Sequence, residues 1–161
     1  MLRKAEEKDI PALFTLIEGY AAKAQLLRRS EESLRAGLSD FTVYEERGEV
    51  VACGALMPLG DNGLGEIRSL AVRETHAGKG IGRLLVEDLM REAPSRGFTE
   101  VIALTRRISF FEALGFQKTQ RELYLDKIQV DCRTCPLNLC CDETAVRRPV
   151  LAVVDQEGAL R

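Results

Sequence analysis

Three glycines at alternate positions, Gly78, Gly80 and Gly82, mark the segment of this chain with the clearest chemical use. An aliphatic run, residues 67–72, precedes them, and a helical pattern follows directly, which predicts a strand, a glycine loop and a helix N-terminus. The first amides of a helix have no intrahelical partner and lie at the positive end of its dipole. Because glycine has no Cβ, a ligand can approach this backbone closely. The segment therefore predicts a binding site for an anion such as a phosphate.

Two familiar phosphate-binding loops do not fit this segment. The Walker loop needs four residues between its glycines and then Lys followed by Ser or Thr, a pattern that is absent here. The dinucleotide fingerprint GxGxxG needs glycine at position 83, which is Arg83. The alternative without function is a plain glycine-rich turn between a strand and a helix.

Composition limits the class of protein. The chain has 161 residues, 45% hydrophobic and 30% charged, which fits one soluble domain with a real core. Its net charge of −2 provides no basic field for nucleic acid or an anionic membrane. The N-terminus lacks an apolar stretch of signal-peptide length, and no run of about 18 apolar residues occurs. We therefore expect a cytoplasmic protein with no nucleic-acid and no membrane partner.

Periodicity and turn residues predict the elements that position the loop. Asp9 is expected to cap a helix with Pro11 in its first turn, and Ser30 to begin a second, shorter helix. A tight Arg47-Gly48 turn joins two alternating strands. The predicted strands are residues 2–5, 41–46, 49–59, 65–72, 100–105 and 124–130, and the later helices are residues 80–97 and 108–114. Antiparallel strands precede a strand–helix–strand unit, which predicts an α+β (mixed α/β) fold with helices on both faces of the sheet.

A second motif follows the predicted strand at residues 100–105. Residues 110–116 read FFEALGF, an amphipathic helix ended by glycine. With GKGIG at residues 78–82, this segment resembles the pyrophosphate loop and the "FYxxxGF" motif of the GCN5-related N-acetyltransferases (GNAT). The resemblance covers about residues 1–125 and implies a GNAT domain there, with a mostly antiparallel central sheet. Residues 126–161 would then form a C-terminal extension, packed on the same domain or at a subunit interface.

The resemblance implies an acyltransferase that uses acetyl-CoA as its cosubstrate. In this family, backbone groups of the strand and of the glycine loop hold the pantetheine, the thioester and the diphosphate. The cofactor-binding residues so implied are Leu70, Ala71, Val72, Gly78, Lys79, Gly80, Ile81, Gly82 and Phe111.

The chain departs from the family pattern at two positions. Ala77 stands where an Arg or Gln before the first glycine is usual, which leaves the backbone amides with Lys79 or Arg83 as helpers. Phe111 stands where a Tyr often protonates the departing thiolate. Either Tyr124 supplies this proton, or water does, or the thiolate leaves unassisted, since a thiol has a pKa of about 8.5.

Glu66 is the candidate general base. It shares a strand face with Arg68 and Leu70, since side chains alternate along a strand. A free α-amine has a pKa of about 8, so a carboxylate acting through water is a sufficient base. The alternatives are a solvated strand residue or one that only orients Arg68.

Several segments resemble the short, single-domain bacterial N-acetylglutamate synthases. They read RKAEEKDIPALFTLIEGYA, LLRRSEESL, EIRSLAV and DCRTCPLNLCCDETAV. This resemblance implies a small-molecule amine acceptor, the α-amine of L-glutamate, and a role at the start of arginine biosynthesis.

A dicarboxylate substrate suits fixed guanidinium groups, which bind carboxylates with two hydrogen bonds. Arg68 on the strand and Arg28 or Arg29 before the second helix are placed to supply them. The alternative for Arg28 and Arg29 is a solvated pair in a loop. Ser69 is a further substrate-binding candidate, or supports the sheet from the face opposite to Arg68.

Four of the five cysteines lie in residues 132–141, spaced C-x2-C-x4-C-C. Thiolates at this spacing suggest zinc or an iron–sulfur cluster, with Cys132, Cys135 and Cys141 as ligands and an Asp or water completing the site. Reduced thiols, a redox disulfide and inert packing are the alternatives.

Two other functions fit the same motifs. One is acetylation of another small amine or of a protein N-terminus. The other is a degenerate fold that senses acetyl-CoA or an amino acid, which Ala77 and Phe111 support. A homodimer is compatible with either function.

Overall fold

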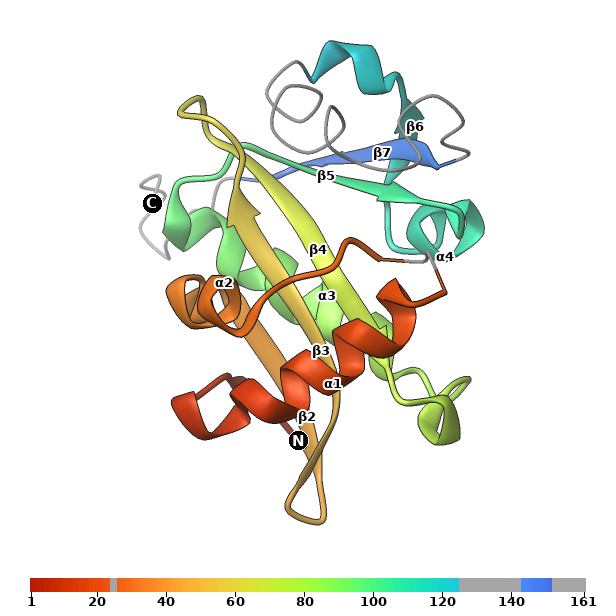
Figure 1. Cartoon of the computed structure of the whole chain (residues 1–161). Coiled ribbons are helices and arrows are strands. Elements are labelled where there is room, and N and C mark those ends of the chain that lie inside the picture. Colours follow the sequence, from red (N-terminus) through yellow and green to blue (C-terminus); the bar gives the residue numbers. More distant parts are fainter. Residues whose placement is uncertain (24–25, 125–142, 152–161) are drawn as a thin grey trace, which may run out of the picture. The chain divides into compact units, whose positions relative to one another are not determined.

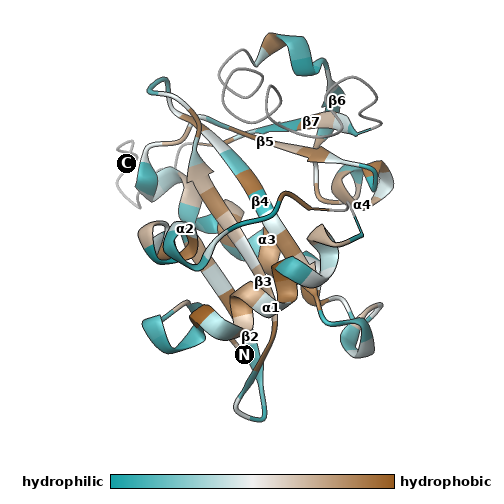
Figure 2. Cartoon of the chain, in the orientation of Figure 1, coloured by the Kyte–Doolittle hydropathy of each residue, from teal (hydrophilic) through white to brown (hydrophobic). Residues whose placement is uncertain are grey.

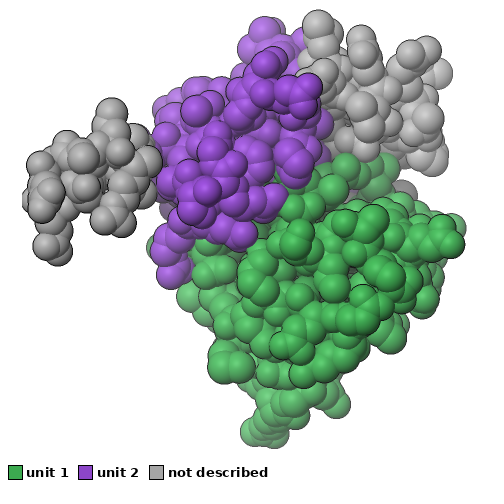
Figure 3. Space-filling view, turned by 90° about the vertical axis from the view of Figure 1, so that its left-hand side faces the viewer, with its two compact units in different colours: residues 1–57, 67–89 green, residues 58–66, 90–161 purple. Residues whose placement is uncertain are grey.

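The computed structural model describes residues 1–23, 26–124 and 143–151. Figure 1 shows the helices and strands of these residues, and Figure 3 colours the two compact units that the chain forms. The first unit contains residues 1–57 and 67–89, and the second contains residues 58–66 and 90–161. Strand β4 (Leu64–Val72) begins in the second unit and ends in the first.

The first unit is built on antiparallel strands. Strand β1 (Leu2–Lys4) pairs antiparallel with β2 (Phe41–Glu46), and β2 pairs antiparallel with β3 (Glu49–Pro58). The β2–β3 turn has Arg47 and Gly48 at φ 52° and 79°, the left-handed pair that a two-residue hairpin requires. The predicted Arg47-Gly48 turn is therefore confirmed, and the end of β4 follows β3 in the strand order.

Helices cover both faces of these strands. Residues of α1 (Ile10–Ala21) and α2 (Glu31–Ala36) share one buried cluster with alternate residues of β2 and β3, such as Val43 and Cys53. Residues of α3 (Ile81–Glu92) share a second cluster with the residues that point the other way, such as Ala52. Figure 2 shows the strands between the helices as largely apolar and the β2–β3 turn as polar. The predicted layering is confirmed for this unit.

The two predicted helix caps have different outcomes. The Ser30 hydroxyl accepts a hydrogen bond from the Ser33 amide at 3.1 Å, so Ser30 caps α2 as expected. Asp9 does not cap α1 with its side chain. Its carboxylate instead accepts hydrogen bonds from Arg3 at 2.7 and 3.0 Å and from the Glu6 amide at 2.8 Å. Asp9 holds the N-cap position as predicted, but its side chain makes no cap, because the bonds from Arg3 and from the Glu6 amide occupy its carboxylate.

The second unit contains a parallel pair and two antiparallel pairs. The start of β4 runs parallel to β5 (Glu100–Thr105), and β5 pairs antiparallel with β7 (Thr144–Pro149). Strand β6 (Gln117–Thr119) pairs antiparallel with β7, and helix α4 (Ile108–Glu112) precedes it. The mostly antiparallel pairing that was predicted is confirmed. The sequence did not predict β6 or β7, and residues 125–130 of the strand expected at 124–130 lie outside the described residues.

Short 3-10 turns connect these elements, at Glu7–Asp9, Leu38–Asp40, Glu74–His76, Ala93–Arg96 and Arg121–Leu123. Gly97 ends the helical stretch after α3 with φ 79°, as the sequence predicts. Among the described residues, no helix is long and apolar enough to cross a membrane. The boundary at residue 125 between a domain and an extension stays a prediction.

Candidate functional site

The glycine loop joins the end of β4 to the start of α3 in the first unit. Gly78 and Gly80 have φ of 78° and 82°, a left-handed backbone that costs other residues about 1–2 kcal/mol. A Cβ built at either position would meet no atom within 4 Å, so packing does not require glycine there. Residues 78–80 are exposed, and α3 begins at Ile81. The loop thus presents backbone amides at a helix N-terminus, the geometry that binds phosphates.

The segment before the loop is held by side chains. His76 Nε2 lies 2.6 Å from Glu46 Oε2, and Thr75 Oγ1 lies 2.9 Å from His76 Nδ1. The hydrogen bond from His76 lowers the pKa of the Glu46 carboxyl. These contacts connect the loop to the end of β2. His76 therefore supports the segment that leads into the loop.

Buried side chains of α3 fix the other end of the loop. Ile81 and Leu85 lie in the cluster beneath α3. Arg83, a suggested helper for the diphosphate, lies on the exposed side and pairs with Glu87 at 3.0 Å. Lys79 is also exposed and needs no rearrangement of the core to reach an anion.

The end of β4 departs from regular strand geometry at Ser69. Its φ of 53° is left-handed, which is uncommon for a residue other than glycine and strained. The buried Cys53 thiol donates to the Ser69 carbonyl at 3.4 Å. Burial raises the pKa of Cys53 to about 12, so this thiol stays neutral. The simple alternation that was predicted to align residues 66, 68 and 70 is therefore interrupted.

The predicted cofactor-binding residues of β4 split between the two faces. Leu70 and Val72 pack with the cluster beneath α3, whereas Ala71 packs with the cluster beneath α1 and α2. Their side chains are thus used in packing, which leaves the backbone groups as the means of contact with a ligand.

Arg28 and Arg29 have different surroundings, although they are neighbours in sequence. Arg28 pairs with Glu18 at 2.8 Å, and its side chain is 65% exposed. The Arg29 guanidinium lies 5.4 Å from the centre of the Phe41 ring and donates to Ser33 Oγ at 3.0 Å. The solvated alternative fits Arg28, whereas Arg29 is a partly buried and oriented guanidinium.

Gly37 leaves room for the Arg29 side chain. A Cβ at Gly37 would lie 3.4 Å from Arg29 Nη2. A second nitrogen of the same guanidinium lies 3.6 Å from Met57 Sδ. These contacts hold the guanidinium in one orientation, with Nε and Nη2 both donating to Ser33 Oγ, at 3.2 and 3.0 Å.

Glu66 and Arg68 lie on the two parts of β4. Glu66 is 2% exposed and lies in the second unit, in register with Ile102 of β5. Arg68 is half-buried and lies in the first unit. A solvated Glu66 is therefore excluded, and a carboxylate this deeply buried is costly unless it is paired and hydrogen-bonded. Its role as a base stays a proposal.

The aromatic candidates lie in the second unit. Phe111 is 5% exposed and packs edge-to-face on Phe110 and Phe116, at ring-centre distances of 5.1 and 5.2 Å. The Tyr124 hydroxyl donates to Glu100 Oε1 at 2.6 Å. Burial and this hydrogen bond raise the pKa of Tyr124, so its proton is retained at neutral pH.

The predicted metal ligands Cys132, Cys135 and Cys141 lie outside the described residues. In the part of the chain that the structure describes, no cluster of three or more His, Cys, Asp or Glu side chains could hold a metal ion. The zinc or iron–sulfur prediction therefore has no support from this structure.

Sequence reasoning missed the left-handed backbone at Ser69 and the helix glycine Gly19. Ser69 carries no local signal, because serine commonly occurs in regular strands. Gly19 does have a local signal, because glycine inside a helical pattern is unfavourable and therefore indicates a packing or functional role.

The family profile "Acetyltransferase (GNAT) family" matches residues 7–116. An uncharacterized N-acetyltransferase of Chlorobaculum tepidum is 39% identical over 90% of this chain and 93% of its own. An amino-acid acetyltransferase of Mycobacterium tuberculosis is 36% identical over 74% of this chain and 70% of its own.

Solved structures agree with this family. N-acetylglutamate synthase of Neisseria gonorrhoeae, complexed with coenzyme A and N-acetyl-glutamate, matches with a TM-score of 0.83 and 26% identity. That match covers 94% of this chain and 35% of the other. Other amino-acid acetyltransferases are also longer, and the match spans 26% of one from Shewanella oneidensis. This chain therefore belongs to the GNAT family and is an acetyl-CoA-dependent N-acetyltransferase.

Proposed function

We propose that the chain transfers the acetyl group of acetyl-CoA to the α-amine of L-glutamate, at the start of arginine biosynthesis. The observation that carries this proposal is the oriented Arg29 guanidinium, in the same unit as the glycine loop. A fixed guanidinium suits a substrate carboxylate, and Arg68 on β4 is the candidate for the second carboxylate. The similarity to amino-acid acetyltransferases supports the choice of an amino acid as acceptor.

The backbone of the glycine loop would bind the diphosphate, since a helix N-terminus stabilises an anion. Residues 78–82 supply these amides, and Leu70, Ala71 and Val72 supply the backbone contacts along β4. A backbone N–H aimed at the thioester oxygen would stabilise the oxyanion that forms during attack.

Proton transfer needs only modest help in this reaction. An α-amine has a pKa of about 8, so Glu66 acting through water would be a sufficient base. The amine nitrogen attacks the thioester carbonyl, the C–N bond forms and the C–S bond breaks. Tyr124 is the proposed donor to the thiolate. Replacing it in Tyr124→Phe should lower kcat without changing the affinity for coenzyme A, whereas an unchanged kcat would assign this proton to water.

A panel of acceptors tests the proposed substrate. Free coenzyme A thiol is measured with L-glutamate, L-aspartate, L-glutamine, L-alanine and a peptide with a free N-terminus. We expect the highest kcat/KM for L-glutamate, because two carboxylates can use two guanidinium groups. A higher kcat/KM for the peptide or for L-alanine would overturn the choice of glutamate, and thiol release with none of them would indicate a sensor.

A further inference from the structure

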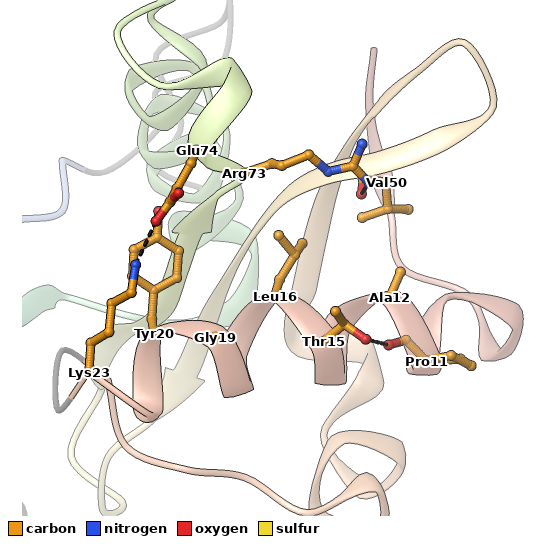
Figure 4. Close-up of a pocket in the computed structure, with 10 residues that line it drawn as sticks. All are labelled: Pro11, Ala12, Thr15, Leu16, Gly19, Tyr20, Lys23, Val50, Arg73 and Glu74. Carbon is orange, nitrogen blue, oxygen red and sulfur yellow. Dashed lines mark hydrogen bonds and ion pairs between the residues drawn. The ribbon is translucent and has the colours of Figure 1, made fainter.

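A groove of about 560 Å³ lies along α1 in the first unit, and nothing in the acetyl-transfer site uses it. Figure 4 shows one side of α1 facing the start of β3 and the residues that follow β4. The volume suits a small molecule. The groove is lined by Pro11, Ala12, Thr15, Leu16, Gly19, Tyr20, Lys23, Val50, Arg73 and Glu74.

The middle of the groove is apolar and contains a glycine. Ala12, Leu16 and Tyr20 recur at helical spacing on this side of α1. Gly19 lies beside them, although glycine inside a helix is unfavourable. A Cβ on Gly19 would meet no atom within 4 Å, so no neighbour requires glycine there. The missing side chain keeps this part of the groove open.

Charges of both signs lie at the edge of the groove. Lys23 Nζ pairs with Glu74 Oε1 at 2.6 Å, and both side chains are more than half exposed. Arg73 Nη1 pairs with Glu49 Oε2 at 2.8 Å, and its side chain is 40% exposed. Exposed pairs of this kind exchange partners at little cost. The edge can therefore receive a carboxylate on a cation and an ammonium group on Glu74.

We infer that this groove binds a free amino acid with a large apolar side chain. The side chain would lie along Ala12, Leu16 and Gly19, because these residues supply the apolar surface. The α-carboxylate would bind Lys23 and the α-ammonium would bind Glu74, because these two opposite charges lie together at one end of the groove (Figure 4). Only a zwitterion uses both signs of charge at this edge.

The groove is connected to the glycine loop through the chain. The Tyr20 hydroxyl donates to the Val72 carbonyl, and the Arg73 amide donates to the Val51 carbonyl at 2.8 Å. Glu74 begins the 3-10 turn that leads to Gly78. An amino acid in the groove therefore contacts the segment that positions the loop. This coupling rests on the proposed role of the loop in acetyl-CoA binding, whereas the binding site itself does not.

Calorimetry with L-phenylalanine tests the binding site. We expect saturable binding to the wild type, at least tenfold weaker binding of phenylacetate and of phenethylamine, and at least tenfold weaker binding by Gly19→Leu and Lys23→Gln. Ala22→Leu is the matched control, because Ala22 is exposed near the same helix end and does not line the groove. It should bind as the wild type does.

Three results would overturn the inference: no saturable binding, equal binding by Gly19→Leu, or equally tight binding of phenylacetate. Gly19→Ala separates two effects of Gly19→Leu, the occupation of the groove by a side chain and the stabilisation of α1. Alanine has a higher helix propensity than glycine and adds only one carbon to the groove. Its affinity should lie between those of the wild type and Gly19→Leu.

Titration of coenzyme A with and without L-phenylalanine tests the coupling. We expect the affinity for coenzyme A to change at least threefold in the wild type and to stay constant in Gly19→Leu. An unchanged affinity in the wild type would overturn the coupling while leaving the binding site in place. Failure of coenzyme A to bind at all would instead contradict the proposed function of the loop.

Discussion

Arg28 and Arg29 show how far two identical neighbours can differ at the scale of single residues. The sequence presents them as equivalent, and only tertiary contacts separate them. Arg29 lies over Phe41 and bonds Ser33, whereas Arg28 forms one exposed ion pair. Exposed pairs contribute about 0–1 kcal/mol, so the two arginines should respond very differently to substitution.

Arg29→Ala should lower kcat/KM for L-glutamate by about ten- to a hundredfold. Loss of one charge-assisted hydrogen bond to a carboxylate corresponds to about 1.5–3 kcal/mol. The change should be mainly in KM, and the affinity for coenzyme A, measured by calorimetry, should stay as in the wild type. Arg28→Ala is the matched control and should change kcat/KM by less than about threefold. Equal effects of the two substitutions would remove Arg29 from the acceptor site.

Glu66→Gln tests the proposed base while keeping the size of a buried side chain. We expect kcat to fall by about a hundredfold and the acid limb of its pH profile to disappear, because the titrating group is gone. If Glu66 has only a structural role, Glu66→Gln should lower the thermal midpoint of unfolding and leave the shape of the pH profile unchanged. That outcome would contradict a catalytic role.

At the scale of elements, local pattern predicted the strands and helices with distinct periodicity or turn residues. The β2–β3 hairpin and the glycine loop before α3 belong to this group. Strand β6 has only three residues, and β7 pairs with β5 across a long stretch of sequence. Neither pairing has a local signal, because register between distant segments is decided by tertiary contacts. The left-handed backbone at Ser69 was missed because it, too, has no local signal.

Gly80→Val tests the glycine loop as an element. The loop needs φ 82° at this position, which a β-branched residue adopts only with strain. We expect the affinity for coenzyme A to fall at least tenfold, because the new side chain would occupy the space of the diphosphate, and about 1.4 kcal/mol of lost contact corresponds to a factor of ten.

Gly48→Val is the control for strain alone. Gly48 has φ 79° and, like Gly80, no atom within 4 Å of a Cβ, but it lies in the β2–β3 turn. Both variants should lose similar thermal stability, while only Gly80→Val loses affinity for coenzyme A. Equal affinities of the two variants would contradict the assignment of the loop.

For the whole molecule, family membership and the main elements followed from two short motifs, whereas the acceptor depends on contacts between distant residues. The glycines identify an anion site because the backbone itself binds the ligand. Recognition of a small acceptor uses side chains that sequence spacing does not bring together. The stability of the fold also depends on contacts between separate elements. Arg3 of β1, for example, pairs with both Asp9 before α1 and Glu45 of β2.

The Arg3–Asp9 pair predicts how the stability of the chain depends on pH. The hydrogen bond from Arg3 lowers the pKa of Asp9 below its ordinary value of about 3.9. A carboxyl with a lowered folded-state pKa stabilises the fold above its unfolded pKa, and this contribution is lost as the pH falls through the folded pKa. Asp9→Asn should therefore cost about 1–3 kcal/mol of unfolding free energy at pH 7.

Urea unfolding at a series of pH values measures this contribution. The difference in unfolding free energy between the wild type and Asp9→Asn should have its full size above about pH 5. It should shrink below about pH 4, because the protonated wild-type carboxyl then resembles the amide. Asp61→Asn is the control, since Asp61 is exposed and should show no such difference at any pH. A gap between Asp9→Asn and the wild type that stays constant from pH 7 to pH 3 would show that Asp9 acts through its shape and neutral hydrogen bonds rather than through its charge.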